Sequence, residues 1–197
     1  MFETCDVLVF TLGLTEGWVS DADGAVVPLS PGVEGSGDVN YRFVNFAVDD
    51  MVKDLTVFIT KLRILNPGVR IILTVSPVAL VATYEPRHVL VSTMYSKAAL
   101  RVTAEMVANA FEDVAYFPSY EIITGPQARG RYWEADLREV RPEGVAHVMR
   151  VFKRHFLTGR DSAAPSRKRV EVTISAEERE NLEREYQVVC DEEVLDA

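Results

Sequence analysis

Three short apolar segments, each stopped by glycine or proline next to polar side chains, constrain the fold of this chain most strongly. They cover residues 5–10, 69–75 and 114–117. A nearly continuous apolar run is typical of a strand that is covered on both faces, as in a parallel sheet between helices. The carboxyl ends of such strands form the edge where ligands bind, so the polar residues behind each segment are candidates for one site.

Amphipathic helical patterns lie between and after these strands. Asp49 is placed to cap a helix that runs to residue 65, and Pro67 ends it. A second helix is expected over residues 96–112, and a third reaches residue 156. The apolar stripe of this third helix consists of Val145, Val148, Met149, Phe152 and Phe156. Alternating strands and helices predict right-handed crossovers, and hence an α/β, flavodoxin-like, three-layer fold around a parallel sheet.

The remaining segments are predicted to be irregular or separate from this domain. Residues 20–46 contain several glycines and prolines and no helical period, which indicates a long loop. The domain is expected to span residues 1–157, followed by a linker over 158–170. Residues 171–197 form an acidic tail, in which a capping box predicts a last helix over about residues 175–193: Ser175-Ala176-Glu177-Glu178.

Charge and composition exclude several classes of function. The tail holds ten acidic side chains and two arginines, and thus carries −8 of the net charge of −9. The rest of the chain shows no basic face, so nucleic-acid binding is not expected. No apolar run reaches the ~18 residues of a membrane span. Cys5 and Cys190 have neither metal-ligand nor disulfide spacing, and no signal segment is evident, which favours a cytoplasmic protein without metal or cofactor.

Six motifs, in order and at consistent spacing, resemble the GSCFA-domain family, which is grouped with the SGNH (GDSL-like) hydrolases. The resemblance runs from about residue 5 to residue 156. The motifs are Thr11-Leu12-Gly13-Leu14-Thr15-Glu16-Gly17-Trp18, Asn66-Pro67, Thr74-Val75-Ser76-Pro77, Tyr95-Ser96-Lys97, Leu100-Arg101 and Tyr116-Phe117-Pro118-Ser119-Tyr120-Glu121.

The resemblance implies an SGNH-type ester hydrolase or acyltransferase but does not identify its substrate, for which a small acyl ester or a carbohydrate ester is the candidate. In the family, the nucleophile is the serine of a Gly-Ser-Cys-Phe-Ala motif after the first strand, and a late Asp-x-x-His supplies the base and its partner. A polar residue at the sheet edge helps to form the oxyanion hole. All three parts are needed, because a serine hydroxyl is a poor nucleophile without a base and the oxyanion needs donors.

This sequence departs from the family pattern in two places. The Gly-Ser-Cys-Phe-Ala segment and the first two strands are missing, so that Met1 precedes what resembles the third strand of the family. The late motif reads Asp136-Leu137-Arg138-Glu139, with Glu139 at the position of the histidine. A glutamate with an ordinary pKa of about 4.3 is a weak base for serine. We therefore expect impaired catalysis, with a non-catalytic binding or interaction module, or a fragment of a longer enzyme, as the alternatives.

Gly13, Thr15 and Glu16 follow the first strand and are the first candidates for the site. Thr15 stands two residues after Gly13, where SGNH enzymes keep a polar oxyanion-hole residue; a turn or cap hydroxyl is the other interpretation. Glu16 either lines the pocket or bonds to the backbone of a loop. We expect Thr15, Asp136 and Glu139 to be the remnants of the catalytic machinery.

Further candidates follow the other strands. Ser76, before Pro77, is interpreted as a turn residue at the binding edge rather than as a nucleophile. For Ser96 and Lys97 the sequence favours helix capping and attraction of an anion over a Ser–Lys dyad, because adjacent helical residues point about 100° apart. Tyr120 and Glu121 either present a phenol and a carboxylate to the binding edge or, in the slightly favoured interpretation, pack and bond to a neighbouring loop. His88 is the one histidine considered for the pocket. His147 and His155 are expected on a solvated flank and near a helix end.

The first strand is also predicted to be an exposed apolar edge. No earlier segment is available to flank residues 5–10, and a flat apolar edge invites pairing with another chain. We therefore expect either a shortened copy of a longer protein or self-association along this edge.

Overall fold

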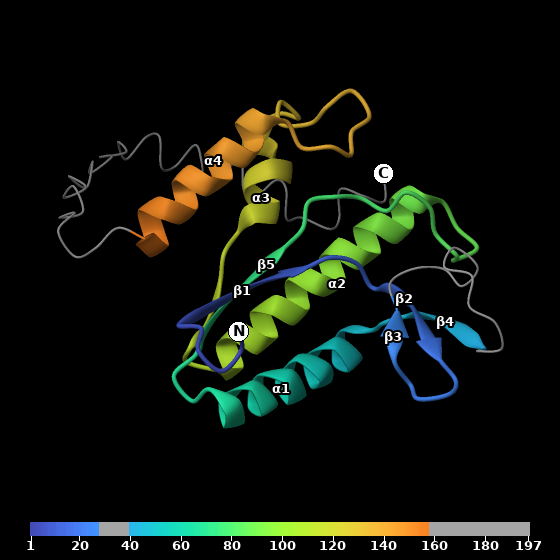
Figure 1. Cartoon of the computed structure of the whole chain (residues 1–197). Coiled ribbons are helices and arrows are strands. Elements are labelled where there is room, and N and C mark those ends of the chain that lie inside the picture. The colour runs from blue at the N-terminus through green and yellow to red at the C-terminus, as the bar shows by residue number, and fades with distance from the viewer. Residues whose placement is uncertain (28–39, 158–197) are drawn as a thin grey trace, which may run out of the picture. The chain divides into compact units, whose positions relative to one another are not determined.

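The computed structural model describes residues 1–27 and 40–157 (Figure 1). The linker over 158–170 and the acidic tail with its expected last helix lie outside the described residues. Within the described residues, no helix combines the length and the apolar character that a membrane span would need.

A parallel sheet of three strands forms the centre of the domain. Its strands are β1 (Val7–Leu12), β5 (Arg70–Val75) and β6 (Val114–Tyr116), in the order β1-β5-β6. In the register, Val9 lies beside Ile72, and Leu73 beside Tyr116. The predicted α/β fold with a parallel sheet is therefore confirmed, and the three apolar segments are its strands.

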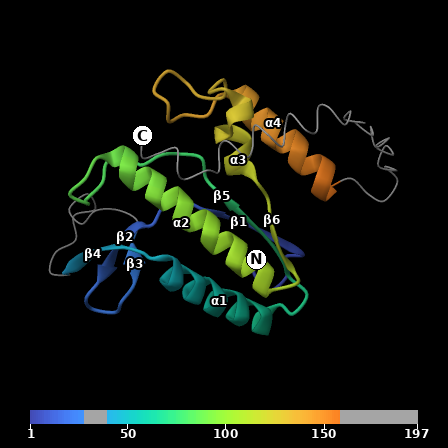
Figure 2. The ribbon, with the colours of Figure 1, turned by 180° about the vertical axis from the view of Figure 1, so that it is seen from behind.

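Helices α1 (Val48–Leu65) and α2 (Val89–Ala110) lie on one side of this sheet in both views (Figures 1 and 2). Their apolar faces and the strands share one core, because strand side chains alternate between the two faces of the sheet. The fully buried members include Ile59, Leu62, Ile71, Leu73, Leu100 and Val107.

Shorter elements follow β6 on the other side of the sheet. They are α3 (Ser119–Thr124), the 3₁₀ turn η1 (Pro126–Ala128), α4 (Pro142–Phe152) and the π-helical turn η2 (Lys153–Leu157). The ring of Phe117 packs edge-on against Phe152 and Phe156, with centroids 5.2 and 5.8 Å apart. This aromatic cluster joins the end of α4 to the segment behind β6.

A second, antiparallel sheet corrects the prediction of a loop over residues 20–46. It consists of β2 (Glu16–Ser20), β3 (Val26–Val27) and β4 (Tyr41–Asn45), in the order β3-β2-β4. An aromatic cluster stabilises it: the Trp18 ring lies 5.6 Å from Phe43 and 4.7 Å from Tyr84. These strands are short, and the glycines and prolines of the segment hid them from the sequence pattern.

Two helix starts also differ from the prediction. Helix α2 begins at Val89 rather than residue 96, and its cap is His88, whose Nδ1 accepts a hydrogen bond from the Leu90 amide at 3.1 Å. Helix α1 is capped by Ala47 instead of Asp49, and the Asp50 carboxylate accepts from the Ala47 amide at 3.3 Å. An imidazole nitrogen can act as the capping acceptor, which a search for Ser, Thr, Asp or Asn misses.

Helix α4 follows the predicted apolar stripe only in part. Val148, Phe152 and Phe156 pack on the domain as expected. Val145 and Met149, however, are 50% and 44% exposed. In their place the helix packs through Gly144, where an added Cβ would lie 2.9 Å from the Cβ of Tyr132.

The outer edge of β1 has no strand beside it in the described part of the chain. Asp6 and Leu12 accept backbone bonds from β5, at 3.1 and 2.9 Å. In a parallel strand the bonding residues alternate, so the amides and carbonyls of Val7, Val9 and Thr11 point away from β5. Val7 and Val9 are exposed as well. Self-association along this edge stays a prediction.

Candidate functional site

The polar residues behind β1, β5 and β6 lie at one edge of the sheet. Ser76 donates its amide to Leu12 at 2.9 Å, and Phe117 donates its amide to Leu73 at 2.8 Å. These bonds align the three strand ends, so that the segments beginning at Gly13, Ser76 and Pro118 leave the sheet side by side. We call these segments, with the α2 residues that contact them, the rim.

Lys97 anchors the rim from within the protein. Its side chain is only 2% exposed, and its ammonium donates to the Gly13 carbonyl at 2.8 Å. None of the ion pairs among the described residues includes it. Burial lowers the pKa of Lys97 from its ordinary 10.5 to about 8, since a charge removed from water favours its neutral form. The expected attraction of an external anion is hard to reconcile with this burial.

Ser96 and Thr15 form a second buried contact at the rim. The Thr15 amide donates to Ser96 Oγ at 3.0 Å, and both residues are almost fully buried. Ser96 therefore lies inside helix α2 and does not cap it, which corrects the prediction. Thr15 Oγ1 is buried without a hydrogen-bond partner. An orphaned buried hydroxyl is costly to the folded state.

Glu16 fastens the loop that leads to α2. Its carboxylate accepts from the Thr83 hydroxyl at 2.5 Å and from the Tyr84 amide at 3.3 Å. Thr83 Oγ1 also lies 3.0 Å from Ser92 Oγ. Of the two interpretations of Glu16, the geometry matches the bond to a loop backbone.

The hydroxyls behind β5 and β6 bond to one another and to the backbone. Ser119 Oγ donates to the Val75 carbonyl at 3.0 Å, so the contact of 2.5 Å with Thr74 Oγ1 is donated by Thr74. Ser76 Oγ accepts from the Val78 amide at 3.2 Å, as in a turn. The sequence predicted Ser76 here but missed Thr74 and Ser119.

Glu121, in the rim segment that begins at Pro118, belongs to a network of its own. Its carboxylate accepts from Arg101 Nε at 2.8 Å and from the Tyr116 hydroxyl at 2.8 Å. Burial, and then the bond to Glu121, raises the pKa of Tyr116 above its usual range. The neighbouring Tyr120 is partly buried against the main core. Glu121 thus has structural partners, and its carboxylate is not directed to the binding edge as a free group.

The late acidic residues lie in an exposed turn. Asp136 Oδ1 accepts from the amides of Arg138 and Glu139, at 2.9 and 3.0 Å. These two backbone bonds lower the pKa of Asp136. In the part of the chain described here, no hydrogen bond joins Asp136 or Glu139 to a hydroxyl of the rim.

The histidines, all of them described, have other partners. His88 caps α2, and His147 Nδ1 lies 2.5 Å from the Tyr132 hydroxyl. His147 is half-buried, which corrects its predicted place on a solvated flank. His155 lies in the π-helical turn η2. The described residues contain no group of histidine, cysteine and carboxylate side chains that could hold a metal ion.

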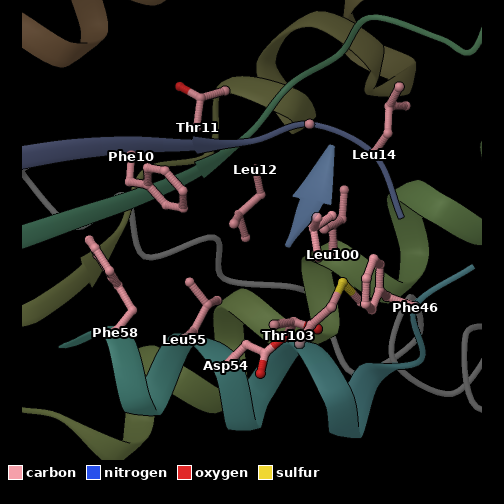
Figure 3. A pocket seen from close by; sticks show the side chains of 13 residues that line it. Phe10, Thr11, Leu12, Leu14, Phe46, Asp54, Leu55, Phe58, Leu100 and Thr103 are labelled. Carbon is pink, nitrogen blue, oxygen red and sulfur yellow. The ribbon is translucent and has the colours of Figure 1, made fainter. Parts of the chain in front are cut away.

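An apolar pocket of about 400 Å³ opens between β1 and α1, next to Gly13 (Figure 3). Phe10 and Leu12 point into it from β1, toward Leu55 and Phe58 of α1, whereas Thr11 points away. Thr103 also lines the pocket, and its Oγ1 is buried without a partner. Asp54 is the charged residue of its lining.

A signal for two further hydroxyls that the prediction missed, Ser92 and Thr103, was present in the sequence beside the predicted Ser96. Ser92, Ser96 and Thr103 recur at the spacing of one helix face, and they share this face with the buried Leu100 and Val107. A polar side chain on a buried apolar stripe destabilises the fold unless it is hydrogen-bonded. Such a residue therefore marks a contact with another element.

The family of the chain follows from a comparison with known proteins. The GSCFA family model matches residues 1–152, which include every strand and helix named above except η2. Searches of curated proteins and of solved structures found no match. The resemblance drawn from the sequence motifs is thereby confirmed, and the chain belongs to the GSCFA family.

Proposed function

We propose that this chain is a relative of SGNH-type ester hydrolases and acyltransferases that is itself catalytically impaired. Membership of the GSCFA family supports the relationship. The observation that carries the impairment is that each serine at the rim is engaged with a group that cannot activate it. Ser76 accepts from a backbone amide, Ser96 accepts from Thr15, and Ser119 is bonded between Thr74 and a carbonyl.

A serine attacks an ester only when a base removes its proton within about 2.6–3.2 Å. None of the described histidines or carboxylates bonds to a rim serine. The nearest candidates by sequence, Asp136 and Glu139, are exposed, and Asp136 is held in its own turn. A carboxylate whose pKa is lowered is a still weaker base.

Two features support recognition of an ester without its hydrolysis. The unpaired Thr15 hydroxyl stands at the position of the oxyanion-hole residue in the family. The apolar pocket beside Gly13 offers space for an acyl chain, with the unpaired Thr103 hydroxyl in its lining (Figure 3). A non-catalytic module that binds a neutral acyl ester is therefore the second candidate function.

The experiment measures turnover of p-nitrophenyl acetate and butyrate by the purified chain. We expect rates equal to those of a matched protein without an active site, and equal rates for an Asp136→Ala, Glu139→Ala double variant. Turnover well above this background that disappears in the double variant would show a working carboxylate base and refute the impairment.

Binding is tested separately, by saturation-transfer NMR with ethyl butyrate. The wild-type chain is expected to give a signal that a Leu55→Asp variant of the pocket loses. The isosteric Thr103→Val variant reports whether the orphaned hydroxyl bonds the ligand. No signal from the wild-type chain would exclude the binding function, and the outcome of the turnover assay would stand.

A further inference from the structure

A second depression, separate from the rim, is lined mainly by cationic side chains. It measures about 550 Å³ and lies beside the first turns of α4. None of its lining residues lines the apolar pocket of Figure 3. We call it the arginine depression, and the residues that matter are Arg131, Tyr132, Arg141, Glu143, His147 and Arg150.

The fold gathers these residues from two segments. A bridge between Trp133 and Val140 closes the preceding loop, and the Arg141 amide donates to the Tyr132 carbonyl at 2.8 Å. This pairing places Arg131 and Arg141 on two neighbouring segments of the chain. Glu143, His147 and Arg150 recur at i, i+4 and i+7 in α4, and thus share one face of the helix.

The charge of the depression is positive and only partly compensated. Arg141 lies 3.8 Å from Glu134 and 3.9 Å from Glu143, in exposed contacts that are weak ion pairs. Within the described ranges, Arg150 has neither an ion pair nor a hydrogen bond, although Glu143 lies on the same helix face. Three guanidinium groups therefore face one lining carboxylate.

The floor of the depression is an ordered chain of hydrogen bonds. Tyr132 is 6% exposed, and its hydroxyl accepts from Arg131 Nη2 at 2.7 Å. The phenol proton is then free to go to His147 Nδ1, 2.5 Å away. A neutral imidazole that accepts at Nδ1 carries its proton on Nε2. The bond from Arg131 thus favours the tautomer in which His147 accepts from Tyr132 and donates from Nε2.

We propose that the arginine depression binds an oxyanion with at least two negative charges, such as a phosphoryl group. Planar guanidinium groups bond bidentately to phosphate and carboxylate oxygens, and arginine is the residue type suited to this geometry. The imidazole Nε2 adds a neutral donor. A polyanion such as nucleic acid does not fit, because the cationic surface is confined to three arginines in a chain with a net charge of −9.

The test is isothermal titration of the full chain with pyrophosphate, inorganic phosphate and citrate, at pH 7 and constant ionic strength. We expect saturable binding of pyrophosphate with one site. Arg150→Gln is expected to weaken it about tenfold, as for the loss of one charge-assisted bond. Because Arg150 has no ion pair or hydrogen bond within residues 1–27 and 40–157, we expect this variant to keep the fold. Arg129→Gln, which removes an exposed arginine outside the depression, is the matched control and should leave the affinity unchanged.

A second readout follows the histidine directly. In ¹⁵N-detected NMR, His147 is expected as the Nε2–H tautomer, assigned with a His147→Gln variant, and pyrophosphate should shift its Nε2 resonance. Tyr132→Phe should abolish the single tautomer and weaken binding without removing any charge. Equal binding of citrate and pyrophosphate would identify the charge rather than phosphorus as the feature recognised.

The proposal fails if the wild-type chain shows no saturable binding of any of the three anions at up to about 10 mM, a weak limit even for small ligands. It also fails if Arg150→Gln and Arg129→Gln reduce the affinity equally. Neither outcome depends on the ester assay, since the two sites share no residue.

Discussion

Replacement of Lys97 by methionine should remove a pH dependence from the stability of this protein. The ammonium is buried and has the Gly13 carbonyl as its hydrogen-bond partner. With its pKa lowered from 10.5 to about 8, the folded state is disfavoured by about 3 kcal/mol at pH 7, because one pKa unit corresponds to about 1.4 kcal/mol. Methionine has a similar length and carries no charge.

The sign follows from proton binding. Between pH 8 and 10.5 the unfolded chain holds the lysine proton more tightly than the folded chain, so the free energy of unfolding rises with pH. Above the pKa of the lysine in the unfolded chain, the folded state carries no penalty from Lys97. The penalty grows as the pH falls, and it is complete below the pKa of Lys97 in the folded chain. From pH 7 to pH 9.5 the wild-type chain should gain about 2 kcal/mol relative to Lys97→Met.

At pH 7 the two proteins should differ little. The variant loses the bond to Gly13 and leaves a buried carbonyl unpaired, which costs about 1–3 kcal/mol. This loss offsets the relief from the buried charge. The diagnostic quantity is therefore the change with pH, and the absolute stability of the variant is secondary.

Urea unfolding at pH 7 and pH 9.5, followed by tryptophan fluorescence, measures the effect. The upper limit stays below the ionisation of tyrosine in the unfolded state, at about pH 10. Beyond that pH the raised pKa of Tyr116 destabilises the folded state and obscures the lysine. Lys53→Met, at an exposed lysine of α1, is the control and should keep the wild-type change. An identical change in the wild-type chain and in Lys97→Met would refute a buried charged lysine.

Three further predictions follow from single contacts. Ser96→Ala leaves the buried Thr15 amide unpaired and should cost about 1–3 kcal/mol in urea unfolding, whereas Ser96→Thr keeps the acceptor. Glu121→Gln should lower the pKa of Tyr116 toward its usual value in a titration at 295 nm, incompletely, because burial is the larger cause. Val9→Lys places a charge on the open edge of β1 and should abolish any association seen by light scattering between about 1 and 100 μM; a wild-type chain that is monomeric throughout would remove the edge-pairing hypothesis.

The sequence predicted the central sheet because its strands carry the strongest local signal. The runs at residues 5–10, 69–75 and 114–117 are nearly continuous apolar segments, which is the pattern of parallel strands. The expected coverage of both faces fails for the first run, since Val7, Val9 and Phe10 of β1 are 39–49% exposed among the described residues. The same reasoning failed for β2, β3 and β4. These strands are two to five residues long, and a turn at Gly24 with a φ of 74° interrupts them. Their stability comes from Trp18, Phe43 and the distant Tyr84, a contact that no local window contains.

Part of the packing face of α4 escaped prediction for a related reason. A hydrophobic period assigns the largest apolar side chains to the interior. This was correct for Val148 and Phe152, but Gly144 also packs, because its missing Cβ lets the helix lie against Tyr132. Small residues carry no hydrophobic signal, so the half of the face next to Gly144, including His147, was assigned to solvent.

The rim shows why candidate residues can be located from sequence while their roles cannot. Gly13, Thr15, Ser76, Ser96 and Lys97 all lie where β1, β5 and α2 meet, yet the partner of Thr15 is 81 residues away in the sequence and that of Lys97 is 84 away. A hydroxyl or an ammonium group is equally compatible with catalysis and with a structural bond until this partner is known. Here the partners are backbone groups and other hydroxyls. Chemistry at the rim would first have to break one of these bonds and then bring a base to the released hydroxyl, and this double cost is the physical reason to expect the background rate in the ester assay.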